Sequence, residues 1–421
     1  MICGVRDMEK IGIMGGTFNP IHLSHIMIAG QAMEHLGLDK VLFMPSKLPA
    51  HKDNDELVSE TDRNTMVKAA IKGYPGFEFS DYEMKRDGFT YTADTMEYLT
   101  HDNPDVRYYF ILGGDSLAQF EKWHRPDRIL ERCALVCAPR VSDAVGLKGS
   151  NEEFIKIAKG LVKKFSRKKD DGTDFIPEIH FIPAPIVNIS SSDVRNHIKC
   201  GMSITGMVCP EVNEYIKKNG LYTDAFFESI KEDLQKILKP KRYQHVLNVA
   251  EMAFKLALCH GMDPVKAYTA GLLHDCAKHF TDEEILKEAE KYGIVPEAAE
   301  LKTPANLLHS KVGSFIAAEK YYIEEQEILD AIYYHTTGRP DMTTLEKIIY
   351  IADILEPGRD MDYKPSLDIL RSMATYDLDM VIYNVLENVV PYLLDKCKDS
   401  ICTLTLDTYE YYKNLMADKM N

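Results

Sequence analysis

The segment Ile11-Gly-Ile-Met-Gly-Gly-Thr-Phe-Asn-Pro-Ile-His-Leu-Ser-His25 decides the fold of the first half of the chain. It opens on a short apolar run, Lys10 to Met14, which has the character of a buried strand. Two glycines follow, and a helical pattern that starts at His22 places Ile26 and Ala29 on one face. The sequence therefore predicts a strand, a glycine turn and a helix in direct succession.

Short apolar strands alternate with helical stretches through the rest of this half. The further predicted strands are Lys40 to Phe43, Tyr108 to Leu112, Leu135 to Ala138 and Ile179 to Ile182. Helices are predicted to end near Gly201 and Gly220, and Pro210 opens the second of these helices. The alternation is typical of a parallel α/β sheet covered by helices.

The character of the sequence changes after Leu221, where helical periodicity dominates and no convincing strand pattern appears. The predicted helices are Ile230 to Leu238, His245 to Cys259, Pro264 to Lys278, Asn306 to Tyr322, Glu327 to His335, Thr344 to Leu355 and Leu378 to Leu394. We place a linker around Tyr222 to Phe227. The 421 residues then divide into an α/β domain, 1–223, and an all-α domain, 224–421.

Composition and charge exclude several classes of protein. Hydrophobic residues make up 45% of the chain, which suits ordinary globular cores, and no apolar run reaches 18 residues, so no membrane span is expected. The net charge of −15 repels polyanions and disfavours nucleic-acid binding. Nine scattered cysteines lack paired spacing and are interpreted as reduced thiols. Without a stretch of signal-peptide type at the start, we expect a cytoplasmic protein.

The glycine turn has the properties of an anion cradle. Gly15 and Gly16 let backbone amides approach a phosphate, and the helix that follows offers partial positive charge at its N-terminus. His22 and His25 are three residues apart, so both imidazoles lie on one face of the first helical turn and can donate to phosphate oxygens.

A second candidate phosphate site lies far downstream, in Ile189-Ser-Ser-Ser-Asp-Val-Arg195. The three serines precede a helix that carries Arg195 in its first turn, where a guanidinium can bind phosphate. Simple N-capping by Ser192 or Asp193 is the alternative. Because three serines and an arginine exceed what capping requires, we favour phosphate binding.

These residues resemble the nucleotidyltransferases that carry (H/T)xGH and ISSTxIR-like motifs, and among them the bacterial nicotinate-mononucleotide adenylyltransferases. The resemblance covers about Lys10 to Tyr222. The matching segments are Gly15 to His22, Pro45 to Lys52, Tyr91 to Thr95, Gly113 to Leu117, Trp123 and Ser190 to Arg195. The chain departs from the family pattern at Ser24, where glycine is usual, at Ala50, where proline is common, and at Ser192, where threonine is usual.

The resemblance implies a Rossmann-like nucleotidyltransferase domain that transfers AMP from ATP to nicotinate mononucleotide with the help of Mg²⁺. Its implied catalytic residues are His22, His25, Lys52 and Arg195. Its implied ATP and phosphate contacts are Gly15, Gly16, Thr17, Phe18, Asp115, Ser190, Ser191, Ser192 and Arg195. Its implied nicotinate-nucleotide contacts are Lys47, His51, Thr92 and Trp123. Trp123 is the single tryptophan of the chain, and core packing is the alternative role for its ring.

Histidines and aspartates recur on separate predicted helices of the second half. They are His245, His274, Asp275, His309, His335 and Asp353. Imidazoles and carboxylates that converge from several helices can build a metal site in a bundle. Taken singly, each histidine suits a capping or half-buried role. Asp275 changes this balance, because an ionised carboxylate directly after the apolar run Gly271-Leu-Leu needs a cation.

This ordered set resembles the HD-domain metal phosphohydrolases. The segments Ala270 to Lys278, Tyr334 to Gly338 and Tyr350 to Arg359 are similar to a bacterial subfamily that cleaves diadenosine tetraphosphate symmetrically into two ADP. The match spans about Ile230 to Asp407, and it departs from the subfamily at Asp360 to Tyr363.

The resemblance implies a centre of two divalent or mixed-valence ions, with iron the expected metal. Asp275 would bridge the ions, and Lys278 and Arg359 would neutralise polyphosphate charge. Asp275 and Lys278 are the implied catalytic residues. The first ion would take His245, His274 and Asp353, and the second His309 and His335.

We therefore expect a bifunctional enzyme that acts on small-molecule nucleotides, namely ATP, nicotinate mononucleotide and a dinucleoside polyphosphate, without a nucleic-acid or membrane partner. Two alternatives stay open for the HD domain: a nucleotide-binding regulatory module, and a phosphohydrolase of other nucleotides. A homo-oligomer is compatible with the sequence.

Overall fold

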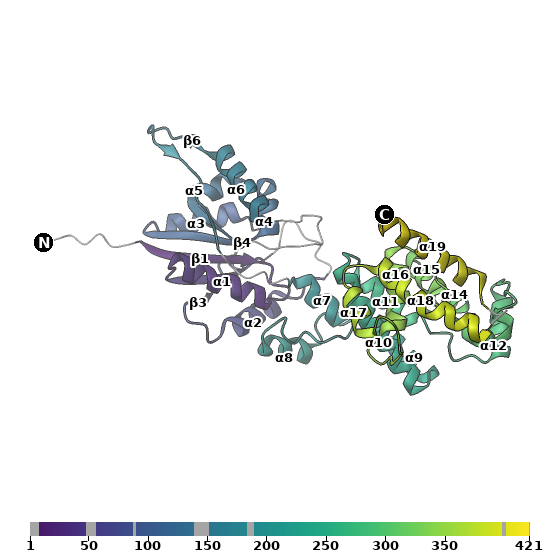
Figure 1. Cartoon of the computed structure of the whole chain (residues 1–421). Coiled ribbons are helices and arrows are strands. Elements are labelled where there is room, and N and C mark those ends of the chain that lie inside the picture. The colour runs from purple at the N-terminus through teal and green to yellow at the C-terminus, as the bar shows by residue number, and fades with distance from the viewer. Residues whose placement is uncertain are drawn as a thin grey trace. The chain divides into compact units, whose positions relative to one another are not determined.

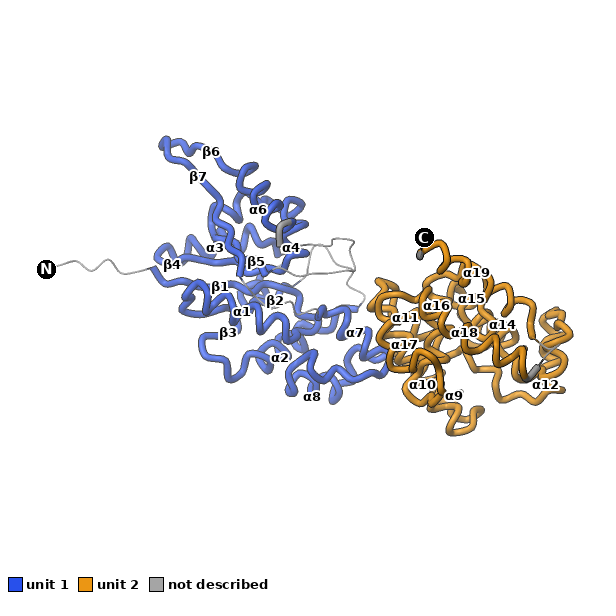
Figure 2. Tube along the Cα trace, in the orientation of Figure 1, with its two compact units in different colours: residues 1–223 blue, residues 224–421 orange. Residues whose placement is uncertain are grey.

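The protein is described by a computed structural model that covers residues 8–47, 56–86, 90–138, 151–182, 189–397 and 401–420. The chain forms two compact units, Met1–Thr223 and Asp224–Asn421, which are coloured separately in Figure 2. None of the described helices is long and apolar enough to cross a membrane.

The first unit is built on a parallel sheet of six strands in the order β3-β2-β1-β4-β5-β8. The strands are β1 (Glu9–Gly16), β2 (Lys40–Pro45), β3 (Phe77–Phe79), β4 (Val106–Gly113), β5 (Cys133–Ala138) and β8 (Ile179–Phe181). The chain runs outward from β1 to β3 and then returns to β4 beside β1, so the strand order reverses between β1 and β4. In sheets of this kind, ligands bind beyond the carboxyl ends of the strands at that switch point.

Helices cover both faces of the sheet, as Figure 1 shows. One face packs against α1 (Leu23–Leu36), α2 (Glu60–Ile71), α7 (Ser191–Lys199) and α8 (Pro210–Asn219). The other packs against α3 (Thr92–Asp102), α4 (Gly114–Ala118), α5 (Pro126–Arg132) and α6 (Asn151–Phe165). Ile11 and Ile13 of β1 point to the second core and Met14 to the first, which is the alternation that a strand imposes. A short antiparallel pair, β6 (Arg167–Lys168) and β7 (Asp174–Phe175), follows α6.

The second unit contains helices and no strand within its described residues. The helices are α9 (Ala225–Ile237), α10 (Pro240–Cys259), α11 (Pro264–Leu273), α12 (Asp282–Lys291), α13 (Pro304–Leu307), α14 (His309–Tyr321), α15 (Gln326–Tyr334), α16 (Thr344–Leu355), α17 (Leu367–Met373), α18 (Leu378–Cys397) and α19 (Thr403–Met420). The predicted fold class, a Rossmann-like α/β domain followed by a helical domain, is confirmed.

A glycine lets two helices of the bundle approach closely. At Gly271 on α11, a Cβ atom would lie 2.8 Å from the Cα atom of Ala250 on α10. Real Cβ atoms do not come so near, so glycine is required for this crossing. The crossing brings the end of α11, where His274 follows, against the helix that carries His245.

Several predicted boundaries are wrong by a few residues. The linker predicted at Tyr222 to Phe227 is shorter, because α9 begins at Ala225. Helix α11 ends at Leu273, whereas the pattern predicted helix to Lys278; Cys276 and Ala277 are buried in the turns that follow, so the apolar pattern continues past the end of the helix.

Candidate functional site

A cavity of about 890 Å³ lies at the carboxyl ends of β1 and β4 in the first unit. The predicted site residues that line it are Gly15, Gly16, Thr17, Phe18, His22, His25, Asp115, Trp123, Ser190, Ser191, Ser192 and Arg195. Lys47 and Thr92 do not line it, and His51 and Lys52 lie outside the described residues. The structure therefore brings both predicted phosphate-binding segments to one cavity at the switch point of the sheet.

The two predicted histidines lie side by side at the start of α1. His22 is the residue before the helix, and its backbone N–H lies 3.3 Å from Nδ1 of His25. The ring centroids are 3.7 Å apart, and the edge of Phe18 packs against His25. Both imidazoles thus stand where the N-terminus of α1 offers partial positive charge.

The three serines at the start of α7 all line the cavity, and one of them also caps the helix. Ser190 caps the helix in a capping box with Asp193, so N-capping accounts for these two residues. The hydroxyl of Ser191 donates to the Pro20 carbonyl at 2.9 Å. Ser24 Oγ donates to the Ile189 carbonyl at 3.3 Å and so joins the starts of α1 and α7; serine in place of the usual glycine makes a contact here.

Arg195 reaches back from α7 to the turn that precedes α1. Its Nη1 donates to the Asn19 carbonyl at 2.9 Å, and its Nε donates to Glu56 Oε2 at 3.0 Å. Glu56 also pairs with Lys199, and the two cations lower the pKa of Glu56 although its partial burial opposes the shift. A carboxylate therefore holds Arg195 at the wall of the cavity.

Asn19 was not identified from the sequence, yet its side chain joins three segments around the cavity. Its Oδ1 accepts from the backbone N–H of Val58 at 3.3 Å and from the Tyr222 hydroxyl at 2.9 Å. Its Nδ2 donates to the Glu56 carbonyl at 2.9 Å. No periodic pattern marks such a residue, because its partners are distant in sequence.

The Trp123 side chain packs against the core and also borders the cavity, so contact with the nicotinate nucleotide stays a prediction. Its ring packs edge-on against Phe110, with centroids 6.0 Å apart, and it also lines the cavity. Lys47 Nζ donates to the Arg86 carbonyl at 2.9 Å, and Thr92 begins α3.

A fully buried guanidinium, also missed from the sequence, joins two loops at the cavity. Arg63 on α2 is 0% exposed, and its Nη atoms donate to the carbonyls of Thr17 at 2.9 Å, Ser46 at 2.6 Å and Lys47 at 3.0 Å. Thr17 belongs to the glycine turn, whereas Ser46 and Lys47 follow β2. Arg63 thus fixes the loop after β1 against the loop after β2.

Replacing Arg63 with methionine should destabilise the first unit substantially. The substitution removes the donor to three partly buried carbonyls, and an unpaired group that is fully buried costs about 1–3 kcal/mol. Urea unfolding of the full chain measures the loss. The surface variant Arg128→Met is the control, since exposed changes stay within about 0.5 kcal/mol. Equal unfolding midpoints for the two variants would contradict this role of Arg63.

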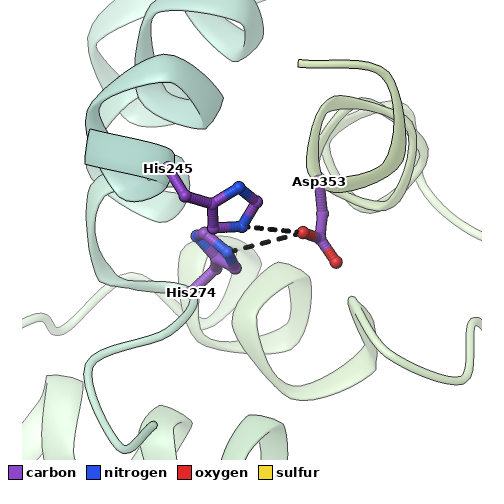
Figure 3. A group of neighbouring side chains, drawn as sticks. All are labelled: His245, His274 and Asp353. Atoms are coloured by element: carbon purple, nitrogen blue, oxygen red, sulfur yellow. Dashed lines mark ion pairs between the residues drawn. The ribbon is translucent and has the colours of Figure 1, made fainter. Parts of the chain in front are cut away.

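In the second unit, the predicted metal ligands converge on one buried point. His245 comes from α10, His274 and Asp275 follow α11, His309 begins α14, His335 follows α15 and Asp353 lies on α16. Asp353 Oδ1 is 3.0 Å from His245 Nε2 and 3.8 Å from His274 Nε2. Figure 3 draws both ion pairs as dashed lines. His245, His274 and Asp353 form one group able to hold a metal ion, and His274, Asp275 and His335 form another.

Asp275 lies between two pairs of imidazoles and turns one oxygen toward each pair. Its Oδ2 is 3.5 Å from His274 Nε2 and 3.8 Å from His245 Nε2. Its Oδ1 is 3.2 Å from His309 Nε2 and 3.9 Å from His335 Nε2. Burial alone would raise the pKa of Asp275, but the surrounding imidazoles hold the pKa well below its usual range. A carboxylate in this position can bridge two cations.

Two of the imidazoles, those of His274 and His335, turn an unprotonated nitrogen toward this point, because each places its Nδ1 2.7 Å from a backbone carbonyl. Burial lowers the pKa of His309 and of His335 to about 4, so both rings are neutral at pH 7. His274 Nδ1 lies 2.7 Å from the Gly271 carbonyl, which sets Nδ1 as the donor and leaves Nε2 with a lone pair. Among the described residues, the buried His274 Nε2 has no hydrogen-bond partner. Such a lone pair beside buried carboxylates suits a metal cation.

Three cationic side chains surround the carboxylates and imidazoles. Lys278 Nζ is 3.1 Å from His309 Nδ1, and Arg359 Nη2 is 2.8 Å from Asp353 Oδ1. Arg242, which the sequence analysis missed, places its Nη1 2.8 Å from Asp275 Oδ2. Arg242 lies three residues before His245 on α10, which places both side chains on one face of the helix. The predicted helix began only at His245 and so left Arg242 outside it.

Comparisons with known proteins assign each half to a family. The cytidylyltransferase-like family model matches residues 13–197, and the HD domain model matches residues 242–358. A solved structure from Clostridium acetobutylicum, titled as a predicted HD superfamily hydrolase involved in NAD metabolism, is 35% identical. It covers 45% of this chain and 97% of its own, with a TM-score of 0.42.

Two relatives match the first half along their whole length. The probable nicotinate-nucleotide adenylyltransferase of Lachnoclostridium phytofermentans is 40% identical over 215 residues, which is 51% of this chain and 100% of the relative. The protein of the same name from Clostridium botulinum is 37% identical over 217 residues, 52% of this chain and 100% of the relative. Through its first half the chain belongs to the nicotinate-nucleotide adenylyltransferase family, and it carries an HD domain in its second half.

Proposed function

We propose that the first unit transfers AMP from ATP to nicotinate mononucleotide and releases pyrophosphate. The observation that carries the proposal is the single cavity at the strand switch point, which joins the glycine turn, the paired histidines, the start of α7 and Trp123. The N-terminus of α1, the paired histidines and Arg195 can bind a triphosphate, and the ring of Trp123 can contact a pyridine ring. The names of the relatives support the same reaction.

The reaction needs positioning more than covalent chemistry. A phosphate oxygen of the acceptor attacks the α-phosphorus of ATP, and the bond to the β-phosphate oxygen breaks, so the charge on the leaving pyrophosphate increases. His22 and His25 would donate to the phosphates beside the glycine turn. Arg195 would exchange Glu56 for the leaving pyrophosphate. Mg²⁺ supplies additional neutralisation of the triphosphate when it is bound.

Product analysis tests this activity directly. The full chain is incubated with ATP, nicotinate mononucleotide and Mg²⁺, and the expected products are deamido-NAD and pyrophosphate in equal amounts. A parallel reaction with nicotinamide mononucleotide measures the preference for the acid. Formation of neither dinucleotide would overturn the proposal.

We propose that the HD domain hydrolyses a dinucleoside polyphosphate, with diadenosine tetraphosphate cleaved into two ADP. The support is the set of four buried imidazoles, the buried Asp275 carboxylate and the partly exposed Asp353 carboxylate, which Arg242, Lys278 and Arg359 border. Water would add across the central P–O–P bond, giving one oxygen to one product and leaving the bridging oxygen on the other.

The donor set fits two hard-to-intermediate cations and favours iron, manganese or a similar metal, because it offers imidazole nitrogens and carboxylate oxygens as ligands. When bound, such ions activate water at neutral pH and neutralise phosphate charge. Asp275 would hold the two ions at a fixed separation. The cations Arg242, Lys278 and Arg359 would orient the polyphosphate over them.

Isotope labelling gives a sharp test of symmetrical cleavage. The full chain, reduced and loaded with Fe²⁺ or Mn²⁺, is incubated with diadenosine tetraphosphate in H₂¹⁸O. We expect two ADP, with one ¹⁸O in a terminal β-phosphate of every pair. ATP and AMP as products would show asymmetric cleavage, and absence of cleavage by a chain that holds its metals would favour a regulatory nucleotide-binding module.

A further inference from the structure

A second buried carboxylate lies behind the metal centre. Glu356 follows the end of α16 and is 3% exposed. Its Oε1 is 3.1 Å from His245 Nδ1, on the side of the ring opposite to the centre. Its Oε2 accepts from Asn248 Nδ2 at 2.8 Å and from the backbone N–H of Gly358.

Glycine at position 358 leaves room for this carboxylate. A Cβ atom there would lie 2.9 Å from Glu356 Oε2 and 3.2 Å from Asn248 Nδ2. Any larger residue would displace the carboxylate or the amide that holds it. Gly358 therefore lets the backbone lie directly against the Glu356 carboxylate.

The other imidazoles show why His245 needs such a partner. His274 and His335 each follow the end of a helix, and their Nδ1 atoms lie 2.7 Å from carbonyls of the last turn, those of Gly271 and Ile332. Carbonyls of a last turn have no partner within the helix and are free to accept. His245 lies inside α10, where the neighbouring carbonyls are used by the helix itself, so its Nδ1–H needs an acceptor from another element.

We infer that Glu356 is a positioning residue for the metal ligand His245. By accepting the Nδ1 proton, it selects the tautomer in which Nε2 carries the lone pair, and it fixes the rotation of the ring toward Asp353 and Asp275. The negative charge of Glu356 also makes the imidazole a stronger ligand. The inference rests on the proposed metal centre but not on the identity of the hydrolysed substrate.

Metal binding by the full chain tests the inference without an activity assay. Wild type, Glu356→Gln and Glu356→Ala are stripped with a chelator and titrated with Mn²⁺, and bound metal is followed by elemental analysis and by electron paramagnetic resonance. Loss of an outer-shell partner weakens metal binding about 10–100-fold, so we expect that loss in both variants, larger for alanine. Glutamine keeps an acceptor for His245 but turns its NH₂ group toward the N–H donors of Asn248 and Gly358.

A matched control lies on the same helix. Glu346 is equally buried, 1% exposed, and its carboxylate binds Arg339 and caps the start of α16. Glu346→Gln should alter stability while Mn²⁺ affinity stays at the wild-type value. Circular dichroism checks folding, and the glutamine variant carries the test if the alanine variant does not fold.

The outcomes separate the inference from the function it rests on. Wild-type Mn²⁺ affinity in a folded Glu356→Gln chain, or an equal loss of affinity in Glu346→Gln, would overturn the role of Glu356. A wild-type chain that binds no Mn²⁺, Fe²⁺ or other transition metal would overturn the metal centre itself.

Discussion

Replacing Asp275 with asparagine should abolish dinucleotide cleavage and leave adenylyl transfer unchanged. Asp275 turns one oxygen toward His245 and His274 and the other toward His309 and His335, so its loss affects both metal positions. An amide nitrogen cannot bind a cation, and the neutral side chain no longer pairs with Arg242. Because Asp275 would contact both ions directly, the loss should exceed the roughly 10–100-fold effect of an outer-shell partner.

The measurement combines both reactions with metal analysis of the same preparation. Asp263→Asn is the matched control, since Asp263 caps the start of α11 and asparagine caps a helix equally well. The control should keep its metal and both reactions. Cleavage at the wild-type rate by Asp275→Asn would exclude this centre as the hydrolytic site. A loss of adenylyl transfer in the same variant would instead favour a regulatory role for the HD domain.

Replacing Arg195 with methionine should lower kcat for adenylyl transfer by about 10²–10³-fold, the range for loss of one donor that stabilises developing charge. Arg195 lines the cavity at the start of α7, and a carboxylate already binds its guanidinium there. The charge on pyrophosphate increases as the bond to the α-phosphorus breaks, so the loss should fall on kcat more than on KM for the acceptor.

Lys199→Met is the control for this prediction, because Lys199 pairs with the same Glu56 from the next turn of α7 but does not line the cavity. It should retain kcat within a few-fold of wild type. If the two variants lost activity equally, the effect would come from the freed Glu56 carboxylate rather than from a missing phosphate contact. Urea unfolding of both chains checks that Arg195→Met still folds, since Arg195 also holds the Asn19 carbonyl.

Hydrophobic periodicity predicted the fold class because it reports which residues of an element are buried. It failed where a helix has few buried residues and where a buried segment is not helical. The strand pattern of Lys10 to Met14 and the helices of the second half follow directly from alternation and from 3.6-residue repeats. Helix α12 was missed because few of its residues are apolar, although its start, Thr281 to Glu284, forms a capping box that the sequence displays. His245 was expected to open a helix, but Pro240 begins α10 and His245 lies in its second turn.

The site residues that belong to short sequence motifs could be predicted from the sequence. The glycine turn, the serines before α7 and the histidines of the bundle were all identified, and the structure brings most of them together. Asn19 and Glu356 lie inside segments that were identified, and Arg63 does not, but none of the three was singled out because the local sequence does not indicate what their side chains contact. Glu356 lies 111 residues from His245, and Arg63 lies 46 residues from Thr17. Contacts of this kind depend on tertiary packing, which a single sequence does not display.

The Tyr222 hydroxyl that donates to Asn19 has a practical consequence for dissecting the protein. Gly220 ends α8 in a left-handed conformation and looks like a natural place to cut the chain. A fragment truncated there would lose the tyrosine, and with it a donor to Asn19, which lines the cavity. Slow adenylyl transfer by such a fragment would then result from the lost hydrogen bond between Tyr222 and Asn19. It could be mistaken for evidence that the first unit needs the HD domain for its activity.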